Sequence, residues 1–151
     1  MNTFRLYIFV SFFALLFNFA WEYTALPLYT DYAALGSGPP LVLWASCFDV
    51  VYVLGIVGAV ALWKGKKDWM VQGTAHEYFL AVFLGFLVAL FVEYKALYFH
   101  RWGYAAAMPI IPILNVGLTP IIQMTVFAPL SALLAGLAER RFLVYSKNES
   151  L

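Results

Sequence analysis

Four long apolar segments, separated by Pro-rich, Gly-rich or charged stretches, constrain the fold of this chain more than any other feature. A helix needs ~20 apolar residues to cross the hydrocarbon core of a bilayer, and each segment reaches that length. Hydrophobic residues make up 64% of the 151 residues and charged residues 11%, whereas soluble domains have ~25% charged residues. The sequence therefore predicts an all-α integral membrane protein, a four-helix transmembrane bundle that forms a single domain over residues 1–151. The predicted spans are 6–25, 40–63, 77–99 and 119–138.

Helix start and stop signals set the boundaries of these spans. Pro27 ends the first, and Thr119-Pro120 provides an N-cap and a first-turn proline that start the fourth. We expect the Pro-rich stretch 104–116 to form a loop or half-helix that caps the outer side of the bundle, since irregular backbone at that depth needs protein around it. Pro129 predicts a kink in the fourth span, and the charged residues 139–141 predict its end, followed by a polar tail. Small residues that favour close helix contact are Gly55, Gly58 and Ala59.

Positive charge is distributed unequally between the two ends of the predicted bundle. Seven Lys and Arg residues fall on the side of the two termini, whereas Lys95 and Arg101 fall near the other side. Under the positive-inside rule, this asymmetry predicts cytoplasmic N- and C-termini. The expected location is the plasma (inner) membrane. The basic start of the chain also fits a signal peptide. The residues after Leu16 are a poor cleavage context, however, so we expect the first segment to be retained as a span.

Composition and residue types exclude several classes of function. The net charge of +1 gives no basis for a nucleic-acid partner. Cys47 is the single cysteine, which excludes a disulfide framework, a CxxC redox centre and a cysteine-built metal site. His76 and His100 lack the spacing of a metal-binding pair, so we expect neither a metal nor a cofactor. We expect His76 and Glu77 to be solvated at the cytoplasmic interface. The expected partners are the lipid bilayer and a lipidic substrate or ligand, and a homo-oligomer stays an open alternative.

Polar side chains inside the spans gather in one half of the predicted bundle. Asp49 lies roughly 13 Å into the second span, and Glu93 lies near the outer end of the third. A carboxylate inside a span costs about 2.5–3.5 kcal/mol on insertion scales, so three of them require a reason. We predict one pocket beneath the non-cytoplasmic surface, roofed by residues 102–116. The polar residues that would meet there are Asn18, Glu22, Asp49, Glu93 and Gln123.

Each candidate residue also has a structural interpretation. Glu22 and Glu93 suit hydrated positions at the interface, with Glu93 paired to Arg101, whereas Asp49 lies deeper and better suits a group that faces a cavity. Amides in spans commonly join helices, and aromatic residues near span ends commonly anchor at the interface. Both kinds also suit the walls of a pocket. The residues predicted to contact a bound molecule are Asn18, Trp21, Arg101, Trp102, Tyr104, Asn115 and Gln123.

About a third of the chain carries a series of short motifs. The acid Glu93 is followed by Trp102 and Tyr104 after a turn, by Gly-Leu-Thr-Pro at 117–120 and by Pro-Leu-Ser-Ala-Leu-Leu at 129–134. These motifs resemble the transmembrane domain of heterodimeric and fused carotenoid (lycopene) cyclases, a small helical unit similar to the membrane terpene cyclases. Where that family has a glutamate pair, this chain has Ile-Gln, which removes an acid of the family's pattern. The chain is also similar to a small four-span bacterial membrane family with Trp-Glu…Pro-Leu-Tyr and Met-Pro…Gly-Leu-(Ser/Thr)-Pro…Gln motifs.

The resemblance implies a membrane-embedded cyclase or isomerase, with isomerase or lyase chemistry on an isoprenoid, as in carotenoid biosynthesis. Cyclisation without a metal needs an acid that protonates a carbon–carbon double bond, aromatic faces that stabilise the carbocation, and a base that ends the reaction. We assign Asp49 as the acid and Glu93 or Glu22 as the base, with Gln123 orienting them. Two other classes stay open: a non-enzymatic membrane protein that binds a lipid or pigment or serves as a subunit of a larger complex, and a small proton-coupled transporter.

Overall fold

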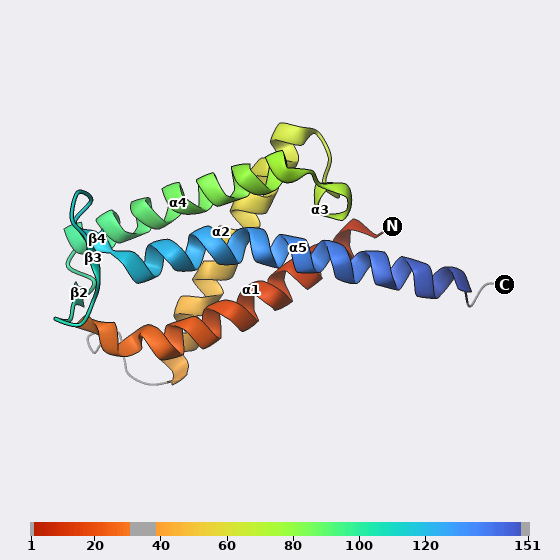
Figure 1. Ribbon diagram of the computed structural model, residues 1–151. Coiled ribbons are helices and arrows are strands. Elements are labelled where there is room, and N and C mark those ends of the chain that lie inside the picture. Colours follow the sequence, from red (N-terminus) through yellow and green to blue (C-terminus); the bar gives the residue numbers. More distant parts are fainter. Residues whose placement is uncertain (1, 31–38, 149–151) are drawn as a thin grey trace.

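Four long helices account for most of the structure, a computed structural model that describes residues 2–30 and 39–148 (Figure 1). Each of the four is long and apolar enough to cross a membrane. They are α1, Thr3–Ala25; α2, Pro39–Lys64; α4, Ala75–Tyr98; and α5, Leu118–Asn148, which contains Pro129. The predicted helical class and the four predicted apolar helices are thereby confirmed.

Short elements join the long helices. They are the 3₁₀ turn η1, Leu26–Leu28; strand β1, Tyr29–Thr30; helix α3, Trp69–Gln72; and strands β2, Gly103–Tyr104, β3, Ile110–Ile111, and β4, Val116–Gly117. β1 pairs antiparallel with β2, and β3 pairs antiparallel with β4. The predicted cap between α4 and α5 is therefore a loop held by two short ladders, and it contains no half-helix. The short helix α3 has no counterpart among the predicted elements.

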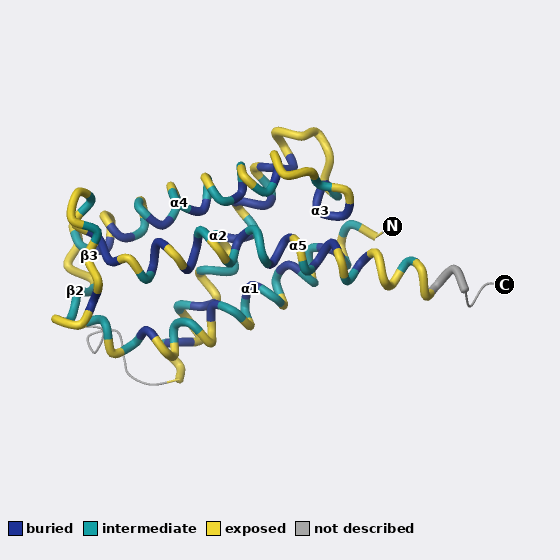
Figure 2. Tube along the Cα trace, viewed as in Figure 1, coloured by how far each residue is buried: buried dark blue, intermediate teal, exposed yellow. Residues whose placement is uncertain are grey.

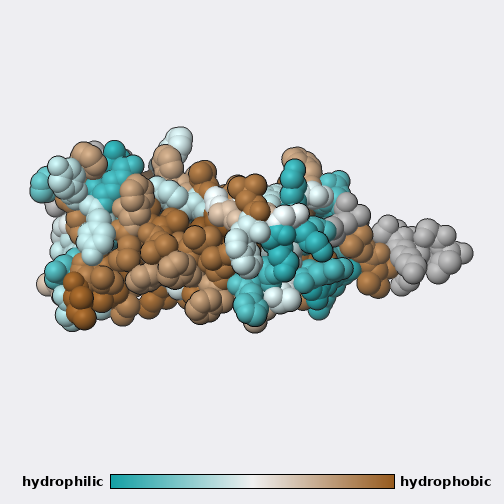
Figure 3. Space-filling view, turned by 90° about the horizontal axis from the view of Figure 1, so that it is seen from above, coloured by the Kyte–Doolittle hydropathy of each residue, from teal (hydrophilic) through white to brown (hydrophobic). Residues whose placement is uncertain are grey.

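The four long helices form one bundle in which α5 lies between α1 and α4, and α2 crosses the other three diagonally (Figure 1). Both chain ends lie at the end that carries α3, opposite the strands. Buried positions recur along the inward side of each helix (Figure 2). Apolar side chains cover the middle of the face shown in Figure 3, and hydrophilic side chains gather toward its ends. Leu62 is 85% exposed and Phe79 is 73% exposed, which suits a surface that faces lipid.

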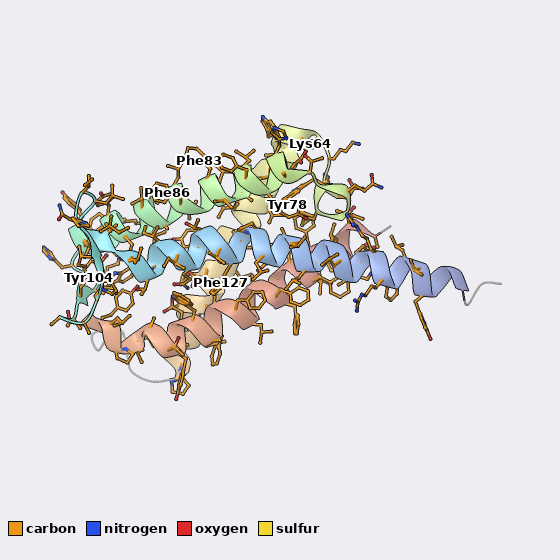
Figure 4. All side chains as sticks on the ribbon, in the orientation of Figure 1. Lys64, Tyr78, Phe83, Phe86, Tyr104 and Phe127 are labelled. Atoms are coloured by element: carbon orange, nitrogen blue, oxygen red, sulfur yellow. The ribbon has the colours of Figure 1, made fainter. Side chains whose placement is uncertain are left out.

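Two buried carboxylates lie at the end of the bundle that carries α3. Glu139 of α5 accepts hydrogen bonds from Arg5, at 2.8 Å from Nε and 2.7 Å from Nη2. Glu77 forms a capping box with Thr74 at the start of α4 and an ion pair with Lys64, which Figure 4 labels at the end of α2. Glu77 is only 1% exposed, so the prediction that this residue is solvated is wrong. Burial is tolerated because the carboxylate has both a cation and hydrogen-bond donors around it.

α5 extends to Asn148, so the prediction that this helix ends at residues 138–141 is wrong, and the described part of the tail is helical. The charged residues do not end the helix because two of them have partners on neighbouring elements. Glu139 forms the ion pair described above, and Arg140 Nε donates to the carbonyl oxygen of Val71 in α3. These contacts attach α3 and the N-terminal end of α1 to α5.

Close helix packing depends on Gly85 and Gly136. A Cβ built on Gly85 would lie 2.7 Å from a backbone carbonyl oxygen of α5, and one built on Gly136 would overlap the carbonyl of Met70 in α3. By contrast, Gly55 and Gly58 of α2 have no described neighbour within 4 Å of such a Cβ, so the prediction that they permit close helix contact is wrong. The glycines that matter are those at which the backbones of two elements touch.

Substituting Gly136→Ala is expected to lower the free energy of unfolding by roughly 1–3 kcal/mol, because the added methyl group forces the backbones of α3 and α5 apart. The matched control is Gly58→Ala, which adds the same group where there is space. Its better helix propensity should leave stability unchanged or raise it by up to ~1 kcal/mol. Unfolding of the purified protein in mixed micelles with increasing dodecyl sulfate, followed by circular dichroism, measures both. Equal stability of the two variants would contradict the close approach at Gly136.

The charge asymmetry predicts a membrane orientation that reporter fusions can measure. A fluorescent protein fused after the last residue should fold and fluoresce in the cytoplasm, while alkaline phosphatase at the same place should stay inactive. Alkaline phosphatase inserted at Ala106, in the exposed loop after β2, should be active. The opposite pattern of the two reporters would show that the bundle inserts the other way round.

Candidate functional site

The side-chain amide of Gln123 joins three helices at the end of the bundle that carries the strands. Its Nε2 donates to Asn18 Oδ1 at 3.0 Å, to Glu22 Oε1 at 2.9 Å and to Asp49 Oδ2 at 3.0 Å. Gln123 is 4% exposed and Asn18 is fully buried, so these contacts lie inside the bundle. An amide nitrogen carries two hydrogens, so three acceptors compete for two donors.

The local structure of α1 explains how two of these acceptors reach the amide. Buried residues of α1 recur every four positions, and Ala14, Asn18 and Glu22 continue that row. Asn18 Nδ2 donates to the carbonyl oxygen of Ala14 at 2.8 Å, which leaves Asn18 Oδ1 free to accept from Gln123. The apolar row of α1 thus ends in two polar side chains at the place where α5 presents its own.

Glu22 of α1 and Asp49 of α2 place their carboxyl groups around the same donor. One oxygen of each lies within 3.0 Å of the same Gln123 nitrogen. Two carboxylates no more than about 6 Å apart repel one another when both are charged, and sharing one proton relieves that repulsion. The arrangement therefore has the composition of a paired acid that a neutral amide holds in place.

Glu93 of α4, which is 2% exposed, contacts two aromatic side chains of the capping loop. The Tyr104 hydroxyl donates to Glu93 Oε2, and Trp102 Nε1 lies 3.5 Å from the same oxygen. The sequence suggested Arg101 as the partner of Glu93, but in the structure these two neutral donors contact the carboxyl group. β2 positions Tyr104, since its pairing with β1 sets this residue opposite Tyr29 at the strand end of the bundle (Figure 4). Burial, together with the contact to Glu93, raises the pKa of the Tyr104 phenol, which therefore keeps its proton at neutral pH.

These groups face a cavity of about 260 Å³ at the strand end of the bundle. All four long helices and the loop after α4 contribute to its walls. Its polar lining residues are Glu22, Asp49, Glu93, Lys95, Arg101 and Gln123, and its aromatic ones are Tyr29, Phe48, Tyr52 and Trp102. Phe48 is 59% exposed, and Lys95 and Arg101 are exposed as well, so the cavity is open along this edge.

Most of the residues singled out from the sequence meet at this cavity. Glu22, Asp49, Glu93, Arg101, Trp102 and Gln123 line it. Asn18 and Tyr104 lie one contact behind the lining, since each is hydrogen-bonded to a residue that faces the cavity. Their positions do not test the roles predicted for them, which stay predictions.

Trp21 and Asn115 lie apart from the cavity. Trp21 packs edge-on against Phe127 of α5, with ring centroids 5.4 Å apart. Asn115 is exposed in the turn between β3 and β4, where its backbone adopts a φ of 54° and its N–H donates to Ile111 at 2.8 Å. Asn tolerates this left-handed conformation better than most residues, so its place in the sequence reflects the turn.

Sequence reasoning missed several residues of the walls. Ala45 and Tyr52 precede and follow Asp49 by four and three positions, so helical spacing alone could have placed them on its face. Lys95 was recognised only as a charge near the outer side. Tyr29 carries no signal in the sequence, because only the pairing of β1 with β2 brings it to the cavity.

Comparison of the chain with protein-family models, curated proteins and solved structures yields no match. Within the described residues, no group of three His, Cys, Asp or Glu side chains is arranged to hold a metal ion. The fold and the site therefore establish the architectural class of this protein. It is a bundle of four helices that are long and apolar enough to span a membrane, with a cavity of paired acids at one end.

Replacing Gln123→Leu is expected to lower the free energy of unfolding by roughly 2–3 kcal/mol, since it leaves the buried Asn18 of α1 and the half-buried Asp49 of α2 without their shared donor. Gln72→Leu is the matched control, because Gln72 is exposed on α3 and the same change there should stay within about 0.5 kcal/mol. Dodecyl sulfate unfolding compares the two. If both variants unfold together with the wild type, the Gln123 amide does not hold the helices.

Proposed function

We propose that this protein is an integral membrane enzyme that uses acid–base chemistry to isomerise or cyclise a lipidic, isoprenoid-like substrate. The observation that carries the proposal is the convergence of Glu22, Asp49 and Glu93, from three different helices, on one cavity with Gln123 between two of them. Carboxyl groups in an apolar bundle are costly, and a packed structural role would not require an open cavity beside them.

The pair Glu22 and Asp49 supports the role of proton donor. Two close carboxyl groups repel one another when both are charged, so the pair retains one proton that a substrate can take, and Gln123 stabilises the negative charge left behind by hydrogen bonding. Asp49 donates the proton to one carbon of a double bond, the π electrons form the new C–H bond, and the neighbouring carbon becomes a cation. Gln123 positions the acids and takes no part in the transfer.

Glu93 supports the complementary role of base. Tyr104 and Trp102 both donate toward it, which favours the carboxylate form that can accept a proton. After rearrangement or ring closure, Glu93 removes a proton from a carbon next to the cation, and the electrons of that C–H bond form the new double bond. The product has the composition of the substrate, and return of the proton from Glu93 to the Glu22–Asp49 pair completes the cycle.

Aromatic residues of the cavity support a cationic intermediate. Tyr29, Tyr52 and Trp102 lie in its walls, and the π faces of aromatic rings attract positive charge. Trp102 stands edge-on to Tyr29, with ring centroids 6.2 Å apart. The segment after α1 and the segment after α4 thus place their rings side by side in one wall. Such a wall stabilises a cation through the π faces of its rings.

A binding protein without catalysis is the second candidate, and the cavity alone supports it equally. Transport is disfavoured by the interior next to the cavity. Toward the chain ends, most buried side chains of the described interior are apolar, among them Leu6, Val10, Val57 and Ala132, and the buried Glu77 and Glu139 are held in ion pairs. Protons or solutes would need polar groups along that stretch, so a path across the bundle is less well supported than chemistry at one end.

Asp49→Asn is expected to reduce product formation at least about 100-fold, because the amide occupies the same space but cannot donate a carboxylic proton. Glu93→Gln should act in the same direction. Each variant is expressed in a host that accumulates linear isoprenoids, and products are identified by chromatography and mass spectrometry. Asp68→Asn, in the loop before α3 and away from the cavity, is the matched control and should retain full product formation.

Two results would count against the proposal. Unchanged product formation in a folded Asp49→Asn variant removes the acid role. A wild-type protein that copurifies with an unconverted lipid, and forms no product, favours the binding protein instead. Circular dichroism and dodecyl sulfate unfolding of each variant separate loss of chemistry from loss of fold.

A further inference from the structure

Two cations, Lys95 and Arg101, line the same cavity as the three carboxyl groups. Lys95 lies near the end of α4, and Arg101 lies in the turn that follows this helix. No described acid forms an ion pair with either of them: the ion pairs of the described residues involve Glu77 and Glu139, at the opposite end of the bundle. The cavity therefore has two positive groups at its exposed edge, close to acids with which they do not pair.

The acids of the cavity are already occupied by neutral donors. Glu22 and Asp49 accept from Gln123, and Glu93 accepts from Tyr104 and lies beside Trp102. At the other end of the bundle, by contrast, Glu139 and Glu77 form ion pairs with Arg5 and Lys64. The separation of acids and cations within one cavity points to a ligand that meets both kinds of group.

The exposed position of the two cations favours an anion held at the edge of the cavity. Lys and Arg together are the usual ligands of phosphate, Arg by two parallel N–H groups and Lys as a compact charge. Lys95 and Arg101 also lie at the end of the bundle where a span leaves the hydrocarbon, and lipid headgroups lie at that level. Lys95 and Arg101 would offset the negative charge of an anion bound there. The anion would also lie away from the acids of the Glu22–Asp49 pair.

The size and opening of the cavity indicate that only part of the ligand is enclosed. Its volume of about 260 Å³ is below the ~300–1,000 Å³ of pockets that enclose a whole drug-sized ligand. Ala45 and Phe48 of α2 and Val92 of α4 contribute apolar atoms to the walls, and Phe48 is 59% exposed. These apolar side chains come from α2 and α4, so the cavity wall between these two helices is where we expect a hydrocarbon chain to lie.

We infer that the ligand is an amphiphile with a terminal phosphate group, which Lys95 and Arg101 bind while the chain lies along the wall between α2 and α4. This inference rests on the proposed function and names its substrate class: an isoprenoid-like chain that ends in a phosphate or diphosphate. The carbon atoms just behind the phosphate then lie in the cavity, where Glu22, Asp49 and Glu93 face them. Chemistry is thereby directed to the double bond nearest the headgroup.

The experiment measures binding to the purified full-length protein in phosphatidylcholine nanodiscs. Calorimetric titrations compare farnesyl diphosphate, farnesol and inorganic pyrophosphate. Farnesyl diphosphate should bind at least about tenfold more tightly than either of the others, since only it supplies both the anion and the chain. The double variant Lys95→Gln/Arg101→Gln should lose that advantage, leaving farnesyl diphosphate and farnesol with similar affinities.

The matched control is Lys66→Gln/Lys67→Gln, which removes two exposed cations between α2 and α3 and should leave all three affinities unchanged. Equal affinity of wild type for farnesol and farnesyl diphosphate would overturn the inference. Equal affinity for pyrophosphate would also overturn it, because the ligand would then be a soluble anion. If the double variant does not fold, Arg101→Gln alone is measured, and an unchanged preference for the diphosphate overturns the inference.

Binding and turnover distinguish the failure of this inference from failure of the proposed function. Asp49→Asn should bind farnesyl diphosphate as tightly as wild type while product formation is lost. If wild type binds the diphosphate preferentially but forms no product, the anion site is supported and the proposed enzymatic function is contradicted. In the opposite case, wild type converts an uncharged isoprenoid, with no change in the Lys95→Gln/Arg101→Gln variant. That result would support the proposed enzyme and contradict the anion site.

Discussion

The amide of Gln123 is the interaction on which the arrangement of the site depends. It reaches from α5 to acceptors on α1 and α2, and both carboxyl groups of the paired acid lie within 3.0 Å of it. Inside an apolar bundle the buried amides of Gln123 and Asn18 would be costly without hydrogen-bond partners. Held together they join three helices, and they keep two acids close enough to share a proton.

The two ends of the bundle solve the problem of buried charge in different ways. At the end with the chain termini, Glu139 pairs with Arg5 and Glu77 pairs with Lys64, so each carboxylate has a cation and a fixed geometry. At the strand end the acids meet neutral donors, and Lys95 and Arg101 stay at the edge of a cavity. The first arrangement fastens elements together, and the second leaves carboxyl groups and cations lining the same cavity.

Much of the fold follows from apolar length, which is why the four spans were predictable to within a few residues at most of their ends. The exceptions arise where a partner distant in sequence changes the local preference. α5 continues past its charged residues because Glu139 finds Arg5, and Glu77 is buried because Lys64 and Thr74 surround it. The sequence pointed to the wrong glycines for the same reason. Gly136 packs against the backbone of Met70 in α3, a short helix that was not predicted from the sequence.

The sequence by itself determined that four helices would form and that Asn18, Glu22, Asp49, Glu93 and Gln123 would lie at similar depth, because rise per residue converts position along a helix into depth. Only the tertiary structure decided which of these side chains touch. The rotation of each helix about its axis and the diagonal crossing of α2 set the contacts of Gln123, while the pairing of β1 with β2 brought Tyr29 and Tyr104 to the same wall. Depth is a local property of a helix, whereas contact between side chains depends on how all the helices pack, and no single segment of the chain contains that information.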